Sequence, residues 1–248
     1  MIRNLRSFTL LSCVLLAFTL AAPLRAAEEA EAAPELPEFN KMVLDIIATY
    51  PTDGTHDYWW PKSGGGGFDG CSMDMYLLGE KVMDGEPQKR TFCCGLTLEV
   101  FLRAYNAWLE AHPGVDPPVK PADWSDFQRT WFVLELNGPG PSAALVKYGI
   151  GEEVLPADVL PGDFVQIWRT KNAKGRVSGH SVIFLEWVRN AEDAIIGFRY
   201  WSTQTSTKGV NERVEYFGPL GGMSTEYTFF GRVKMPEAGG AAAPEATN

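Results

Sequence analysis

The sequence predicts an α+β fold in which helices come first and an antiparallel sheet follows. Apolar residues recur at helical spacing up to about residue 148, whereas β-branched and aromatic runs separated by turn residues begin near residue 164. The chain of 248 residues is 45% hydrophobic and 21% charged, a globular composition that excludes collagen, coiled coil and full disorder. Helices followed by strands with short connections indicate a meander sheet packed on the longest helix.

Both ends of the chain are expected to lie outside the fold. Residues 1–26 combine a basic start, an apolar run and a small residue suited to cleavage, which predicts a signal peptide and an exported, secreted or periplasmic protein. The apolar run is shorter than the ~20 residues of a membrane span, so we expect no span after removal of the signal. Residues 27–37 have the composition of an acidic Ala/Pro-rich linker, and residues 236–248 that of a disordered tail. One domain is expected over residues 38–235.

The charge of the chain argues against nucleic acid as a partner. Removal of residues 1–26 takes away three arginines and no acidic residue, so the formal charge falls from −9 to −12. Such a chain is a poor electrostatic match for phosphate backbones and for anionic membrane surfaces. The sequence contains neither the repeats nor the disulfide ladder of a structural or adhesion protein, and we expect a monomer.

The first half is expected to be helical and rich in loops. A helical apolar period from Phe39 to Ile47 stops before Pro51 and predicts a first helix. Residues 52–69 show no clear period and predict a loop, whereas a strong amphipathic pattern predicts a long helix over residues 93–110. Two shorter helices are expected over residues 124–136 and 142–148.

The second half changes to the period of β-strands. Turn residues such as Pro161-Gly162-Asp163 and Lys174-Gly175 separate runs of β-branched and aromatic residues. We expect four strands, over residues 164–169, 181–188, 194–203 and 227–234.

Three cysteines remain after the signal segment, an odd number for an oxidising compartment, so at least one thiol stays unpaired unless chains pair. Cys93 and Cys94 stand at the start of the long predicted helix, where first-turn N–H groups and the helix dipole stabilise a thiolate. The alternative is that both are buried apolar residues or disulfide partners of Cys71. Which of the two adjacent thiols would react stays open.

A nucleophilic cysteine needs a base, and the chain has three histidines. His112 lies at a predicted helix end and is expected to act as a C-terminal cap. His56 lies in an aromatic loop that could line a cleft. His180 begins a predicted strand, a rigid element that could hold the imidazole at a fixed distance from the helix start, so His180 is the best candidate base. The alternative is a hydrogen-bonded structural histidine.

Three motifs follow one another in the chain: Cys93-x-Gly95-Leu96 opening a long helix, Pro161-Gly162-Asp163 opening a strand, and Gly179-His180-Ser181 opening the next strand. Their order and spacing, over about residues 90–216, resemble the NlpC-type branch of the papain-like cysteine peptidases and amidases that act on cell walls. The chain resembles a divergent member of this family. The resemblance implies a papain-like fold and a secreted thiol hydrolase that cuts amide bonds in peptidoglycan stem peptides, with no cofactor.

By this resemblance, Cys93 matches the nucleophile of the family and His180 matches the general base. A third polar residue that orients the imidazole is expected on the strand after His180, within residues 199–204. Ser202 and Gln204 share one face of that strand by the two-residue alternation. Gln204 has the longer reach and a carbonyl oxygen able to accept from the ring N–H, so we favour Gln204, with Ser202 as the alternative.

The predicted function is therefore an exported cysteine hydrolase that uses a Cys–His mechanism, without metal, on peptidoglycan or related peptides. A zinc site is disfavoured because Cys93 and Cys94 lack the spacing of about two to four residues found in such sites. The stronger alternative is a catalytically inactive papain-like binding module for cell-wall or glycan ligands. Tyr58, Trp59 and Trp60 beside a glycine run could stack on sugar rings, or could pack in the core.

Overall fold

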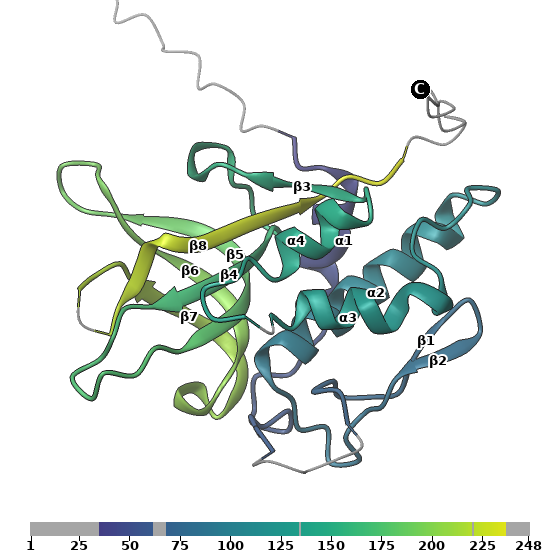
Figure 1. Ribbon diagram of the computed structural model, residues 1–248, viewed down its shortest axis with the longest axis horizontal. Coiled ribbons are helices and arrows are strands. Elements are labelled where there is room, and N and C mark those ends of the chain that lie inside the picture. Colours follow the sequence, from purple (N-terminus) through teal and green to yellow (C-terminus); the bar gives the residue numbers. More distant parts are fainter. Residues whose placement is uncertain (1–34, 62–67, 134, 220, 237–248) are drawn as a thin grey trace, which may run out of the picture. The chain divides into compact units, whose positions relative to one another are not determined.

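The structure is a computed structural model that describes residues 35–61, 68–133, 135–219 and 221–236. The fold is α+β, as the sequence predicts: helices dominate the first half and an antiparallel six-stranded sheet forms in the second (Figure 1). The predicted signal peptide, residues 27–34 of the predicted linker and all but the first residue of the predicted tail lie outside the described residues. Within the described ranges, no helix is long and apolar enough to cross a membrane.

Four α-helices form where helical periods predict them. They are Glu38–Ile47 (α1), Cys93–Ala111 (α2), Trp124–Trp131 (α3) and Pro141–Lys147 (α4). Helix α1 buries one apolar stripe, whereas α2 is buried over most of its length because α1, α3 and the sheet all pack against it. The backbone N–H of His112 donates to the Trp108 carbonyl at the end of α2, and a ring nitrogen contacts the same oxygen at 2.9 Å, which confirms the expected cap.

Helix α3 ends at Trp131 and not at Leu136, so the predicted length of this helix is wrong. The backbone of Val133 has a φ of +51°, which a right-handed helix cannot contain and which is rare for a β-branched residue. The chain then turns through Gly138 and Gly140, and Gly140 also has a positive φ. Apolar residues after the end of α3 therefore belong to a loop, and this loop forms part of a cavity wall described below.

The main sheet has the strand order β3-β8-β4-β5-β6-β7 and is antiparallel throughout. Its strands are Gly151–Val154 (β3), Phe164–Arg169 (β4), Gly179–Arg189 (β5), Ile195–Gln204 (β6), Gly209–Tyr216 (β7) and Met223–Val233 (β8). The predicted meander is confirmed for β4, β5 and β6, and it continues into β7, which the sequence did not predict. The fourth predicted strand, which is β8, does not continue it. Strand β8 then returns to the other side of β4 and pairs with both β4 and β3.

Four strands do not appear in the sequence prediction. Strands β1 (Met75–Leu77) and β2 (Glu80–Met83) have only three and four residues and form a separate two-stranded sheet. Segments of this length are too short to show the alternation of apolar and polar residues that identifies a strand in a sequence. Edge strands β3 and β7 each contain two glutamates among their few residues, which weakens the apolar signal.

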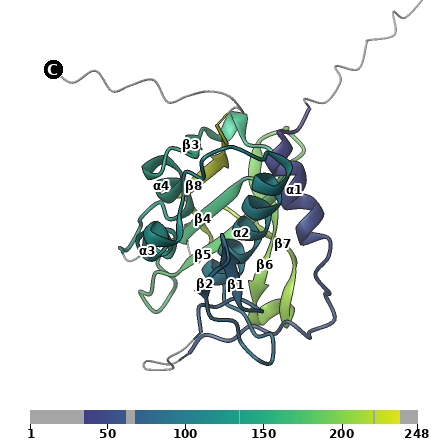
Figure 2. The same ribbon diagram turned by 90° about the vertical axis from the view of Figure 1, so that its right-hand side faces the viewer.

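Helix α2 is the central helix of the fold. It packs against β5 and β6, with α1 and α3 beside it (Figure 2). Because α2 begins at Cys93, β5 begins at Gly179 and β6 ends at Gln204, these element ends provide the residues for one site.

Candidate active site

Cys93 is the first residue of α2 and is partly exposed. Phe92 precedes it in an extended conformation, with φ −128° and ψ 160°, and provides no side-chain cap for the helix. The first turn contains no acidic residue either. Since the first N–H groups of a helix have no acceptor within the helix, this end favours a negative charge on the Cys93 sulfur.

Two close contacts fix the start of α2. The Phe92 ring packs edge-on against Trp60 with centroids 4.8 Å apart, and the Phe92 N–H donates to the Gly70 carbonyl at 3.1 Å. Gly95 lies directly against the chain at Gly70, where an added Cβ would come within 2.5 Å of the Gly70 Cα. The position of Cys93 is therefore determined from both sides of the helix start.

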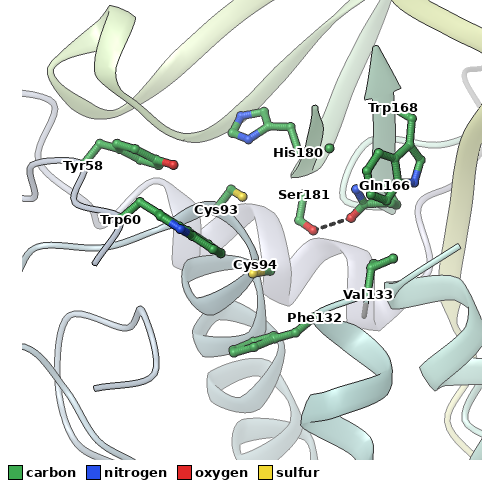
Figure 3. Close-up of a pocket in the computed structure, with 11 residues that line it drawn as sticks. Tyr58, Trp60, Cys93, Cys94, Phe132, Val133, Gln166, Trp168, His180 and Ser181 are labelled. Atoms are coloured by element: carbon green, nitrogen blue, oxygen red, sulfur yellow. Dashed lines mark hydrogen bonds between the residues drawn. The ribbon is translucent and has the colours of Figure 1, made fainter. Parts of the chain in front are cut away.

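His180 lies near the start of β5, and its imidazole faces the Cys93 sulfur across a cavity (Figure 3). The side chain is buried and lies edge-on to the Tyr200 ring, with centroids 5.8 Å apart. Its Nε2 is 2.9 Å from the Gln204 Oε1. Because an imidazole has two ring nitrogens and Gln204 occupies one, Nδ1 is the nitrogen left for Cys93.

The two candidates for the third residue have different partners. The Ser202 hydroxyl donates to the backbone carbonyl of Ser181 at 2.8 Å, whereas the Gln204 side chain meets the imidazole. Both side chains are buried near the end of β6. The structure thus brings together Cys93, His180 and Gln204, the three residues favoured from the sequence.

The adjacent thiols differ in the direction of their pKa shifts. Interaction with the Cys94 thiol, together with the charge and hydrogen bonding of His180, holds the pKa of Cys93 well below its usual range despite burial. Interaction with Cys93, together with burial, raises the pKa of Cys94. Of the two thiols, Cys93 is therefore the one whose surroundings favour the ionised form.

Cys93 and His180 line a cavity of about 370 Å³ (Figure 3). Its other described lining residues are Tyr58, Trp60, Cys94, Phe132, Val133, Gln166, Trp168, Gly179 and Ser181. None of these others is an acidic or basic residue, and four are aromatic. Burial, followed by the charges of Cys93 and Cys94, raises the pKa of Tyr58 to about 12, so this phenol remains a hydrogen-bond donor at neutral pH.

Sequence reasoning missed Gln166 and Ser181 in this cavity. They are register partners on β4 and β5, and the Ser181 hydroxyl donates to the Gln166 Oε1 at 2.7 Å. The Gln166 Nε2 in turn donates to the Ile167 carbonyl at 3.1 Å. A buried amide within an otherwise apolar strand was the available signal for Gln166, because such a group needs a partner.

Other residues discussed from the sequence lie outside the lining of this cavity. Cys71 is a free, buried thiol whose pKa is raised by burial, and the three described cysteines are all unpaired. His56 packs edge-on against Tyr50 at 5.7 Å, and Trp59 stacks on Phe68 at 5.0 Å. The alternative of a disulfide at Cys71 is therefore wrong, and Trp59 is half-buried against Phe68.

Among the described residues, no group of three or more His, Cys, Asp or Glu side chains could hold a metal ion. Comparisons of the chain with protein-family models, with curated proteins and with solved structures find no match. Function is therefore inferred from the chemistry of the cavity.

Proposed function

We propose that this protein is an exported cysteine hydrolase of the NlpC type with a papain-like fold. Its expected substrates are amide bonds in peptidoglycan stem peptides or related peptides. The observation that carries the proposal is the row formed by Cys93, His180 and Gln204, in which a thiolate at a helix start faces an imidazole held by an amide oxygen. A nucleophile, a base and a group that orients the base are the parts that covalent thiol catalysis requires.

The row supplies each step of amide hydrolysis. The Cys93 thiolate attacks the carbonyl carbon and forms a carbon–sulfur bond while an electron pair moves to the oxygen. The carbon–nitrogen bond then breaks, and His180 gives its proton to the leaving amine. Water attacks the thioester as His180 accepts its proton, and the carbon–sulfur bond breaks to release the acid and restore the thiolate.

Two donors are available to the oxygen that becomes negative during attack. The backbone N–H of Cys93 lies at the start of α2, and the protonated phenol of Tyr58 lines the same cavity. Donors placed in advance stabilise the developing charge, and loss of one such donor costs roughly 100- to 1000-fold in rate.

The cavity favours a neutral group on the substrate beside the thiol. Its walls include the apolar rings of Phe132 and Trp168, and its polar side chains Gln166 and Ser181 are uncharged. Apart from Cys93 and His180, which face each other, the described lining residues offer no charged partner to a buried charged group. Charged parts of a peptide are therefore expected to lie outside the cavity.

The test uses the mature protein, Cys93→Ala and Cys94→Ala on peptidoglycan and on short mixed-chirality peptides, with new amino termini measured by mass spectrometry. Wild type is expected to release them and Cys93→Ala is expected to release none. Cys94→Ala is the matched control and is expected to retain part of the activity, because Cys94 is not the nucleophile although its thiol helps to lower the pKa of Cys93. Equal activity of wild type and Cys93→Ala, or no activity in either, contradicts the proposal.

A second candidate function is a catalytically inactive binding module for cell-wall or glycan ligands. One observation favours it: Trp60 is 56% exposed although it lines the cavity. An exposed indole is a surface on which a sugar ring can stack. Co-sedimentation with insoluble peptidoglycan measures this binding, and Trp60→Ala should abolish it in a wild type that lacks hydrolysis.

A further inference from the structure

The turn after β6 contains a hydroxyl that contacts the Gln204 side chain. Thr207 ends the short 3-10 helix Thr205–Thr207 between β6 and β7 and is half-buried. The Gln204 Nε2 lies 3.1 Å from the Thr207 Oγ1, on the opposite side of the amide from His180. Gln204 therefore bridges the imidazole and the threonine.

The single proton of the Thr207 hydroxyl is already committed. It has two acceptors, the Gly209 carbonyl at 2.6 Å and the Gln204 backbone carbonyl at 3.2 Å. Whichever of them takes the proton, the hydroxyl has none left for the Gln204 side chain and can only accept from it. Because the Thr207 oxygen can only accept, the Gln204 side chain must present its NH₂ group to it. The amide oxygen of Gln204 then points toward His180.

The orientation of this amide decides which form of His180 is stable. An amide oxygen at Nε2 requires a proton on Nε2, which leaves Nδ1 free to exchange a proton with Cys93. An amide NH₂ at the same place would require an unprotonated Nε2 and would oppose the imidazolium. Only the first orientation supports a thiolate–imidazolium pair.

Other polar groups near Gln204 do not set its orientation. The Tyr200 hydroxyl lies 3.4 Å from the Gln204 Oε1 but donates to the nearer Glu215 carboxylate at 2.9 Å. The Arg169 guanidinium binds the same carboxylate, with one contact at 2.8 Å. Since a charged, nearer acceptor takes the phenol proton, this network leaves the Gln204 oxygen to the imidazole.

We propose that Thr207 is a positioning residue for the active site. Its hydroxyl holds the Gln204 amide with the oxygen toward His180, and thereby keeps a proton on Nε2. The inference rests on the proposed thiol chemistry, but it requires no knowledge of the natural substrate.

The experiment measures alkylation of Cys93 by iodoacetamide as a function of pH, with peptide mapping to separate Cys93 from the other cysteines. Thr207→Val removes the hydroxyl and keeps the side-chain shape. We expect its alkylation profile to move upward by about one pH unit, which corresponds to about a tenfold loss of thiolate below the inflection. Thr207→Ser should restore the wild-type profile. Thr205→Val, an exposed threonine of the same turn, is the matched control and should leave the profile unchanged.

Each outcome separates the two proposals. A Thr207→Val profile that coincides with wild type, or an equal shift in Thr205→Val, overturns the role of Thr207 while leaving a reactive Cys93 intact. A wild-type Cys93 that reacts like a free thiol overturns both. Circular dichroism checks folding, and Thr207→Ala replaces Thr207→Val if the valine variant does not fold.

Discussion

Cys93 and Cys94 show how one position along a helix changes the chemistry of the same side chain. Successive residues of an α-helix point about 100° apart, so neighbouring thiols enter different surroundings. Cys93 faces His180 and the start of β5, whereas Cys94 is 6% exposed and lies at the floor of the cavity (Figure 3). Composition treats the two thiols alike, and the packed sheet gives them different surroundings.

The lowered pKa of Cys93 predicts fast alkylation in mildly acidic solution. At pH 6 an ordinary thiol, with a pKa near 8.5, is only about 0.3% thiolate. A thiol with a depressed pKa is ionised to a larger extent at the same pH. Iodoacetamide should therefore modify Cys93 at pH 6 at least about tenfold faster than it modifies a free cysteine. His180→Ala removes the favourable charge, so the pKa should rise and the rate at pH 6 should fall. A wild-type rate that follows the free amino acid at every pH contradicts the assignment.

The favoured residues and the missed ones differ in the kind of information they need. Cys93 and His180 follow from motif order, and Gln204 from the two-residue alternation of one strand. Gln166, Ser181 and Thr207 depend on the register of β4 with β5 and on the turn after β6. Neither register nor turn geometry is present in local composition, so the partners of these residues become visible only in the structure.

At the scale of elements, the start of α2 shows what periodicity can and cannot predict. The helical pattern correctly places the beginning of α2, because apolar positions recur from the first turn onward. It does not reveal that Gly95 lies against the backbone of Asp69 and Gly70, in the loop before β1. Likewise, strands β1 and β2 are too short for a pattern, and the apolar run after α3 mimics a helix although Val133 breaks it.

Gly95→Ala should destabilise the protein and lower its activity. Alanine favours a helix interior over glycine by about 1 kcal/mol. The added Cβ would lie 2.2 Å from the Asp69 carbonyl oxygen and 2.5 Å from the Gly70 Cα, which are backbone atoms that cannot rotate away. Overpacking of this kind costs about 1–3 kcal/mol or more and outweighs the helix preference. We expect a net loss of about 2 kcal/mol in the free energy of unfolding, measured by urea denaturation.

The control for this prediction is Gly218→Ala, because an added Cβ at Gly218 meets no atom within 4 Å. The urea concentration at the midpoint of unfolding should be close to that of the wild type for Gly218→Ala. An unchanged urea midpoint for Gly95→Ala would show that the loop at Asp69 moves aside for the added Cβ, and that contact with this loop does not fix the position of Cys93.

At the scale of the folded chain, Asp163 connects segments that are distant in sequence. Its carboxylate accepts from Asn40 on α1 at 2.8 Å and from the Leu160 backbone N–H at 2.8 Å. Arg232 on β8 adds two contacts, at 3.0 and 2.7 Å. The sequence presents Asp163 only as part of a turn before a strand, and in the fold it also joins the first helix to the last strand. The role of Asp163 in the Pro161-Gly162-Asp163 motif is therefore to stabilise the fold.

Asp163→Ala is expected to be among the most destabilising substitutions in the chain. The Asp163 side chain is fully buried and that of Arg232 is 12% exposed, so removal of the carboxylate leaves a largely buried guanidinium without its partner. Breaking a buried pair in this way costs about 3–5 kcal/mol. Lys234, the residue after β8, pairs with Glu152 on β3, but these two side chains are 60% and 41% exposed. Glu152→Ala should therefore cost less than about 1 kcal/mol in the same urea titration, and similar losses for the two variants would contradict the role given to Asp163.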